Sequence, residues 1–189
     1  MTSCTGRAVL VVAFVLALMA PTSPAHAGRD VEVDRVRDAR GYFGRFPREG
    51  RVDPRERAVD ITRFTTALSR RSLTVSVRAR GRISDEFLIV VIRTPRRTYQ
   101  FIYVDTVPGP EAYLMRDGDV VSCRLALRVV RRAVTATLPR TCLSRPRWVR
   151  TGAEAVRDES DATMWIDDAR TPGRSERPGA TLGRRVRVG

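Results

Sequence analysis

Histidine and lysine supply many catalytic bases, metal ligands and covalent links to cofactors, and both are nearly missing from this sequence of 189 residues. The single histidine is His26, and all 35 basic residues are arginines. The chain beyond residue 27 therefore excludes Ser-His-Asp and Cys-His catalysis, histidine-ligated zinc or haem, and lysine Schiff bases. An enzyme that uses two carboxylates needs neither side chain, so that chemistry stays open.

Carboxylates gather in the segment EAVRDESDATMWIDDAR, residues 154–170. Calcium accepts such oxygen ligands, and Asp158 and Asp161 are its candidate ligands here. No other cofactor is expected. The segment lacks the glycine and the terminal glutamate of an EF-hand loop, so the alternative is a solvated loop whose carboxylates pair with nearby arginines. The acidic residues are Glu154, Asp158, Glu159, Asp161, Asp167 and Asp168.

Cys123 and Cys142 are the only cysteines beyond residue 27. An even number of cysteines in an exported chain is typical of a disulfide, whereas a redox-active pair usually has Cys-x-x-Cys spacing. Apolar and polar residues alternate on both sides of Arg131-Arg132, which predicts a β-hairpin with a two-residue turn. The disulfide should then close the open end of this hairpin, where Pro139 permits a bend.

The expected turn sets the register of the hairpin. If Val130 lies opposite Ala133, apolar residues face each other on one side of the two strands, as a buried face requires. The resulting pairs are Val129–Val134, Leu127–Ala136 and Leu125–Leu138.

Similar strand patterns occur along much of the chain. They are found in AVDITRFTTAL, SLTVSVRA, EFLIVVIR, RTYQFIYVDT and RWVRTGAEAV, and glycine- and proline-rich turn signals separate them. No long amphipathic helix interrupts these segments. Six to nine strands joined by hairpins predict an all-β fold, an antiparallel β-sandwich of jelly-roll type.

The sandwich domain is expected at residues 54–168, and the chain on either side differs from it. Residues 28–53 are rich in charge, with a first strand as one option. Residues 169–189 are rich in arginine, glycine and proline, which is typical of a flexible, disordered tail. A tail that binds anions is the alternative interpretation.

Residues 1–27 have the three parts of a secretory signal peptide. Arg7 precedes the apolar run AVLVVAFVLALMA, and Ala-His-Ala ends the segment at residue 27. The run is short for a membrane span, although a retained anchor is the alternative. Cleavage after Ala27 predicts a secreted, extracellular protein without a transmembrane segment and with one positive charge fewer than the formal +14 of the whole sequence.

The positive charge favours an anionic partner outside the cell, such as a wall polymer or an acidic polysaccharide. Nucleic acid would feel the same field, but the sequence has no helix-turn-helix, zinc-finger or RNP-like motif, so this partner is not expected. The exclusive use of arginine has two interpretations. It fits bidentate recognition of phosphate or carboxylate groups, and it also fits the codon bias of a GC-rich genome.

The motifs AVDITRF, LTVSVRARGRI, FIYVDT and, most specifically, Pro139-Arg140-Thr141-Cys142-Leu143 stand out in residues 33–170. This region resembles a group of uncharacterised secreted actinobacterial β-sandwich proteins, which are distantly similar to DOMON domains and family 9 carbohydrate-binding modules. The resemblance implies a β-sandwich. Haem-binding relatives use a histidine ligand, which is missing here. Sugar-binding relatives use exposed aromatic platforms, so the resemblance makes Trp148 and Trp165 the candidate ligand-binding residues, with a core or rim position as the alternative.

Three functional hypotheses follow from these observations. The first is a secreted, non-catalytic domain that binds an anionic wall or polysaccharide ligand, and no catalytic residue is assigned under it. The second is a glycan-acting enzyme, which would need a cleft with two carboxyl groups about 5–10 Å apart. The third is a secreted protein-interaction or inhibitor domain, which would show a large exposed apolar patch.

Overall fold

The computed structural model describes residues 28–34, 37–43, 50–83, 87–106, 108–160, 163–171 and 180–189. The expected signal peptide, residues 1–27, lies outside the described residues. In the described parts of the chain, no helix is long and apolar enough to cross a membrane.

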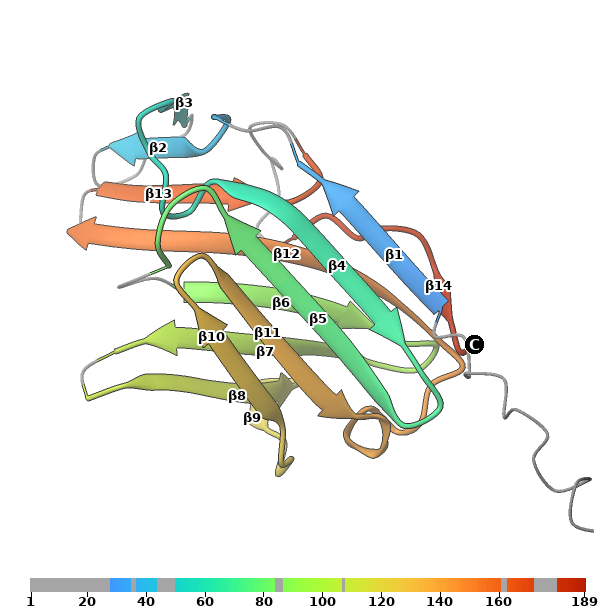
Figure 1. Cartoon of the computed structure of the whole chain (residues 1–189). Helices are drawn as coiled ribbons and strands as arrows, with labels where there is room; N and C mark the ends of the chain where they lie inside the picture. Colours follow the sequence, from blue (N-terminus) through green and yellow to red (C-terminus); the bar gives the residue numbers. More distant parts are fainter. Residues whose placement is uncertain are drawn as a thin grey trace, which may run out of the picture.

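Two antiparallel sheets lie face to face (Figure 1). The first sheet has five strands in the order β1-β4-β5-β11-β10. Each strand pairs antiparallel with its neighbour. Their bounds are β1 (Gly28–Val33), β4 (Ile61–Leu68), β5 (Ser72–Ala79), β11 (Ala133–Pro139) and β10 (Ala126–Val130).

The second sheet has the strand order β3-β2-β13-β12-β6-β7-β8-β9, with β14 also paired to β12. This arrangement of two sheets confirms the predicted antiparallel β-sandwich. The strand bounds are β2 (Arg40–Phe43), β3 (Arg51–Val52), β6 (Phe87–Arg93), β7 (Thr98–Asp105), β8 (Pro110–Arg116), β9 (Asp119–Val120), β12 (Trp148–Ser160), β13 (Thr163–Asp168) and β14 (Val186–Arg187).

The described residues form fourteen strands, more than the six to nine that the sequence patterns predict. Three of the additional strands, β3, β9 and β14, have two residues each, too few to show an alternating pattern. The charge-rich segment before residue 54 supplies β1, β2 and β3, so the sandwich begins earlier than expected.

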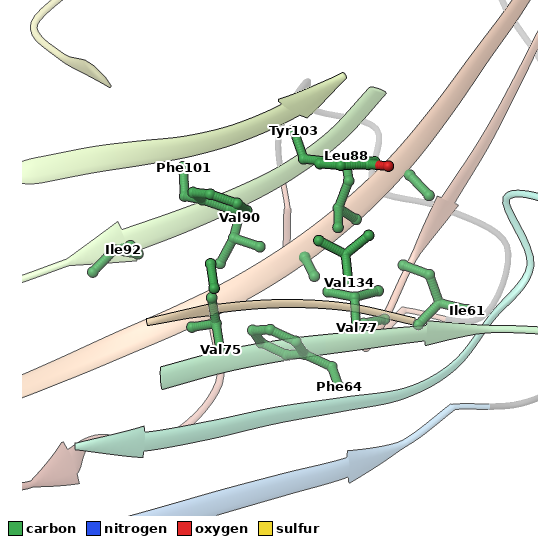
Figure 2. Close-up of a cluster of buried hydrophobic side chains, with 14 of the residues drawn as sticks. Ile61, Phe64, Val75, Val77, Leu88, Val90, Ile92, Phe101, Tyr103 and Val134 are labelled. Carbon is green, nitrogen blue, oxygen red and sulfur yellow. The ribbon is translucent and has the colours of Figure 1, made fainter. Parts of the chain in front are cut away.

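The core lies between the two sheets, because alternate side chains of each strand point inward. Figure 2 shows Phe64 and Val77 of the first sheet approaching Val90 and Phe101 of the second. These side chains are almost entirely buried. One polar contact crosses the same interior: the hydroxyls of Thr66 on β4 and Thr151 on β12 lie 2.6 Å apart and are buried.

The hairpin of β10 and β11 has the predicted register. Val130 pairs with Ala133, Val129 with Val134, and Leu127 with Ala136. Leu125 precedes β10, so the expected pairing of Leu125 with Leu138 is not part of the ladder. The two-residue turn sets this register. Only β11 has a buried face, whereas Val129 of β10 is 38% exposed.

The predicted disulfide between Cys123 and Cys142 is present, with its two Cα atoms 5.8 Å apart. The bend expected at Pro139 is also present, since β11 ends there and a 3₁₀-helix, η2 (Arg140–Leu143), follows. This helix turns Cys142 towards the segment that leads into β10. Both cysteines pack against the hydrophobic core.

Residues 180–189 require a correction, because the sequence predicts a disordered tail from residue 169 onward. In the structure, β14 pairs with the first residues of β12, with Val186 opposite Val149. Val186 is buried, and the Gly183 N–H donates to Thr151 O at 2.9 Å. The physical reason is that a few apolar residues among the arginines pair with the edge of β12. The composition of the segment does not reveal this pairing.

Gly152 makes the close approach of this segment possible. A Cβ atom at this position of β12 would lie far inside contact distance of the backbone oxygen of Thr181. A strand residue with a side chain would therefore push residues 180–183 off the sheet.

The disulfide closes a loop with a sequence separation of 19 residues, so replacing both cysteines with serine should lower the free energy of unfolding by about 3 kcal/mol. Urea denaturation of the C123S/C142S variant measures this loss. The wild type in reductant should lose a similar amount. An unchanged midpoint in both samples would show that the crosslink contributes nothing to stability.

Gly152→Ala should lower the free energy of unfolding by about 1–3 kcal/mol, because the methyl group meets backbone rather than a movable side chain. Amide hydrogen exchange at Gly183 should speed up in the same variant, since its bond to Thr151 O is disturbed. Gly109→Ala is the matched control, because nothing lies within 4 Å of a Cβ there. Equal stability of the two variants would contradict the packing of residues 180–189.

Candidate functional site

The outer face of the five-stranded sheet carries arginines and hydroxyl groups. Arg63 on β4 lies directly opposite Arg78 on β5, and both side chains are exposed. The next cross-strand row holds Thr65, Ser76 and Thr135, and the last two share a hydrogen bond of 2.9 Å. Because strand side chains alternate, the same pattern that buries Phe64 and Val77 places these polar groups outward.

A shallow groove of about 590 Å³ follows this face. Its arginines come from β4, β5 and the β10–β11 turn. None of the described residues that line it is acidic, and its four arginines form no ion pair within the described chain. We call this groove the arginine groove. It is lined by Arg63, Thr65, Ser76, Arg78, Val130, Arg131, Arg132 and Ala133.

Opposed arginines are unfavourable in an empty groove. Like charges directly across a strand pair destabilise a sheet, and Arg63 and Arg78 occupy such a pair. A bound anion would remove this repulsion and accept several charged hydrogen bonds from the planar guanidinium groups. Electrostatics and geometry thus suit the groove to phosphate, sulfate or carboxylate groups.

The second notable group is a buried set of carboxylates at one end of the sandwich. Asp34 follows β1, Asp38 precedes β2, and Asp167 lies on β13. Each offers one carboxylate oxygen, and these three oxygens lie within 4.8 Å of one another. The exposed fractions are 9% for Asp34, 7% for Asp38 and 2% for Asp167. We call these three residues the aspartate cluster.

Asp167 is the most deeply buried member of the cluster. Its Oδ2 accepts a hydrogen bond of 2.6 Å from the Ile61 N–H. Burial raises the pKa of Asp167 to about 9, and the negative charges of Asp34, Asp38 and Asp60 contribute to this rise. At neutral pH, this carboxyl group is therefore neutral unless a cation replaces the proton.

Asp60 stands beside the cluster and is fully buried. Arg80 forms an ion pair with it, with Nε 2.9 Å from Oδ2. The Arg37 N–H donates to the same oxygen at 2.9 Å. Burial still raises the pKa of Asp60, since Arg80 and the hydrogen bond from Arg37 compensate only in part. Asp60 therefore ties the β1–β2 connection to the start of β4.

The described residues do not test the calcium site expected at Asp158 and Asp161, which stays a prediction. Asp158 is exposed on β12, opposite Met164, and Asp161 lies outside the described residues. Of the acidic segment 154–170, Asp167 joins a cluster, but with Asp34 and Asp38 rather than with its sequence neighbours.

Trp165 is covered by an arginine and is not part of an exposed aromatic platform. Trp165 is only 7% exposed, and the Arg157 guanidinium lies 4.5 Å from its ring centroid. Trp165 Nε1 donates to Asp53 at 3.4 Å, and Arg157 pairs with Glu56 at 2.7 Å. This correction applies most clearly to Trp165, which belongs to the core.

Trp148 is partly buried at the start of β12. The Arg185 guanidinium lies 4.5 Å from the centroid of its ring. This contact joins the segment before β14 to β12, so the Trp148 ring helps to hold residues 180–189 in place. Its predicted role in ligand binding stays a prediction.

Comparisons with known proteins add no further constraint: no protein-family model matches this chain, and neither do curated proteins or solved structures. The resemblance of residues 33–170 to secreted actinobacterial proteins and to DOMON and family 9 carbohydrate-binding modules stays a prediction.

The arginine groove had a signal in the sequence. Arg63 and Arg78 occupy outward positions of two alternating strands, and Arg131-Arg132 form the turn between two others. The sequence does not show the strand order that brings these arginines together, because β5 pairs with β11 across an intervening 53 residues. The aspartate cluster had no such signal, since Asp167 is more than a hundred residues away from Asp34 and Asp38.

Arg80→Met should destabilise the protein by about 3–5 kcal/mol, because it leaves the buried Asp60 without its cation. Urea denaturation measures the loss. Arg97→Met is the matched control: its partner Asp117 is 64% exposed, so this variant should lose about 1 kcal/mol or less. The R80M/D60N double variant should be more stable than R80M. Similar losses in R80M and R97M would contradict the importance of burial.

Proposed function

We propose that this chain is a secreted, non-catalytic domain that binds an anionic polymer outside the cell through the arginine groove. The observation that carries the proposal is the directly opposed pair Arg63 and Arg78 in a groove that Arg131 and Arg132 extend. The described residues that line the groove include no acidic residue to neutralise these charges. An anionic ligand is the partner that such a surface fits.

Hydroxyl groups beside the arginines support a ligand with oxygen-rich repeats. Thr65 and Ser76 line the groove next to Arg63 and Arg78. Hydroxyls can donate to anionic oxygens and can also accept hydrogen bonds from a sugar or glycerol hydroxyl. A wall polymer with phosphate groups or a polysaccharide with carboxylates presents both kinds of group. The proposal includes export, which rests on the signal-peptide pattern of residues 1–27 and agrees with a disulfide in the structure.

A rigid scaffold supports a binding role. The groove lies over three neighbouring strands of one sheet, β4, β5 and β11, and the opposite sides of these strands form the core. Side chains on such strands are already close to the positions that they need for binding, which reduces the entropy lost on association.

The R63Q/R78Q variant should bind an anionic polymer at least about tenfold more weakly than the wild type, because two charged hydrogen-bond donors are lost. Isothermal titration with polygalacturonate and with a poly(glycerol phosphate), over a salt series, measures this effect. Wild-type affinity should fall as salt rises. Neutral dextran should not bind.

The matched control is R96Q/R147Q, which removes the same charge from two exposed arginines that do not line the groove. It should change the affinity by a factor of about two or less if net charge alone is a minor contribution. The proposal fails if both double variants lose equal affinity, if binding is independent of salt, or if neither polymer binds the wild type.

A further inference from the structure

We propose that the aspartate cluster binds one divalent cation, and that calcium is the ion that fits it. Asp34, Asp38 and Asp167 converge from the two ends of the β1–β2 connection and from β13. Calcium contacts carboxylate oxygens at about 2.3–2.6 Å, so one ion reaches oxygens up to about 5 Å apart. The three oxygens, all within 4.8 Å of one another, satisfy this limit.

The state of Asp167 is the second observation. Asp167 is only 2% exposed. Its Oδ1 has no hydrogen-bond partner among the described residues. A buried carboxylate oxygen without a donor is costly, and a cation is a direct way to satisfy it.

Asp60 holds the backbone next to two of the proposed ligands in place. Its Oδ2 accepts the Arg37 N–H and pairs with Arg80. Arg37 has a left-handed backbone, with φ of 72°, between Asp34 and Asp38. Asp60 therefore holds Arg37, which lies between these two acids in the sequence. Arg80 forms its ion pair with Asp60 and not with Asp167. This arrangement separates the residue that positions the turn from the residues that offer ligands.

Calcium suits the cluster better than magnesium or a transition metal. The described ligands are all carboxylate oxygens, whereas zinc and copper sites usually include histidine or cysteine. Magnesium demands a near-ideal octahedron at about 2.0–2.1 Å, so oxygens spread towards 4.8 Å suit it less well. The site differs from the one predicted at Asp158 and Asp161, because it joins opposite ends of the sequence.

The test uses the full chain with its disulfide intact, treated with a chelator and dialysed. Calcium chloride is titrated by calorimetry and in thermal unfolding, with magnesium chloride and sodium chloride of equal ionic strength as separate arms. We expect one calcium ion per chain, a Kd on the order of 0.1–1 mM as in extracellular modules, and a rise in Tm that sodium does not produce. Magnesium should bind more weakly.

Asp34→Asn, Asp38→Asn and Asp167→Asn should each weaken calcium binding at least about tenfold, since each removes a charged ligand of similar shape. Asp117→Asn, at an exposed turn, is the control and should leave the affinity unchanged. Near-UV circular dichroism checks the fold, and D34N and D38N carry the test if D167N does not fold. Absence of saturable calcium binding at 10 mM, equal effects of all three salts, or unchanged affinity in D34N and D38N would overturn the proposal.

Discussion

The pairing of β12 with its neighbours is the interaction on which the rest of the structure depends. This strand of 13 residues binds β6 along one edge and both β13 and β14 along the other. It also reaches the opposite sheet through the buried hydroxyl contact between Thr151 and Thr66. The second sheet would divide without β12. The strand β13, which carries Asp167 opposite Ala155, would lose one of its pairing partners.

Burial on one side of each strand explains why the polar groups gather where they do. Phe64 and Val77 must face the interior, so Arg63 and Arg78 have to face solvent in adjacent positions. The aspartate cluster is the opposite case, because polar groups there are held inside. Its burial is supported by fixed contacts, such as the pair of Asp60 with Arg80 and the hydrogen bond from Ile61 to Asp167. The same fold therefore carries arginines on the outer face of one sheet and carboxyl groups at one buried end of the sandwich.

Local patterns in the sequence predicted the parts of the fold that depend on neighbouring residues. The register of β10 and β11, the bend at Pro139 and the disulfide follow from alternation, a short turn and an even number of cysteines. The β14 strand could not be predicted in this way, because two residues show no period and Arg-Gly composition resembles a disordered tail. Its placement depends on Gly152, whose missing side chain matters only once β12 and residues 180–183 are together.

The candidate sites show the same limit. Arg63, Arg78 and the Arg131-Arg132 turn could be read as outward positions, but their proximity depends on the order of β4, β5 and β11. Asp34 and Asp38 are close in sequence, whereas Asp167 reaches them from β13, which pairs with β2. The arginine groove and the aspartate cluster both depend on tertiary contacts between residues far apart in the sequence. No local pattern encodes these contacts.

The position of β14 has a consequence for how the molecule reaches its final form. This strand is synthesised after all the other described strands, yet it pairs with β12 and contacts β1 and β4. A nascent chain that has not yet supplied residues 180–189 leaves the edge of β12 bare beside Trp148. The sandwich can then be completed only after residues 180–189 have been synthesised.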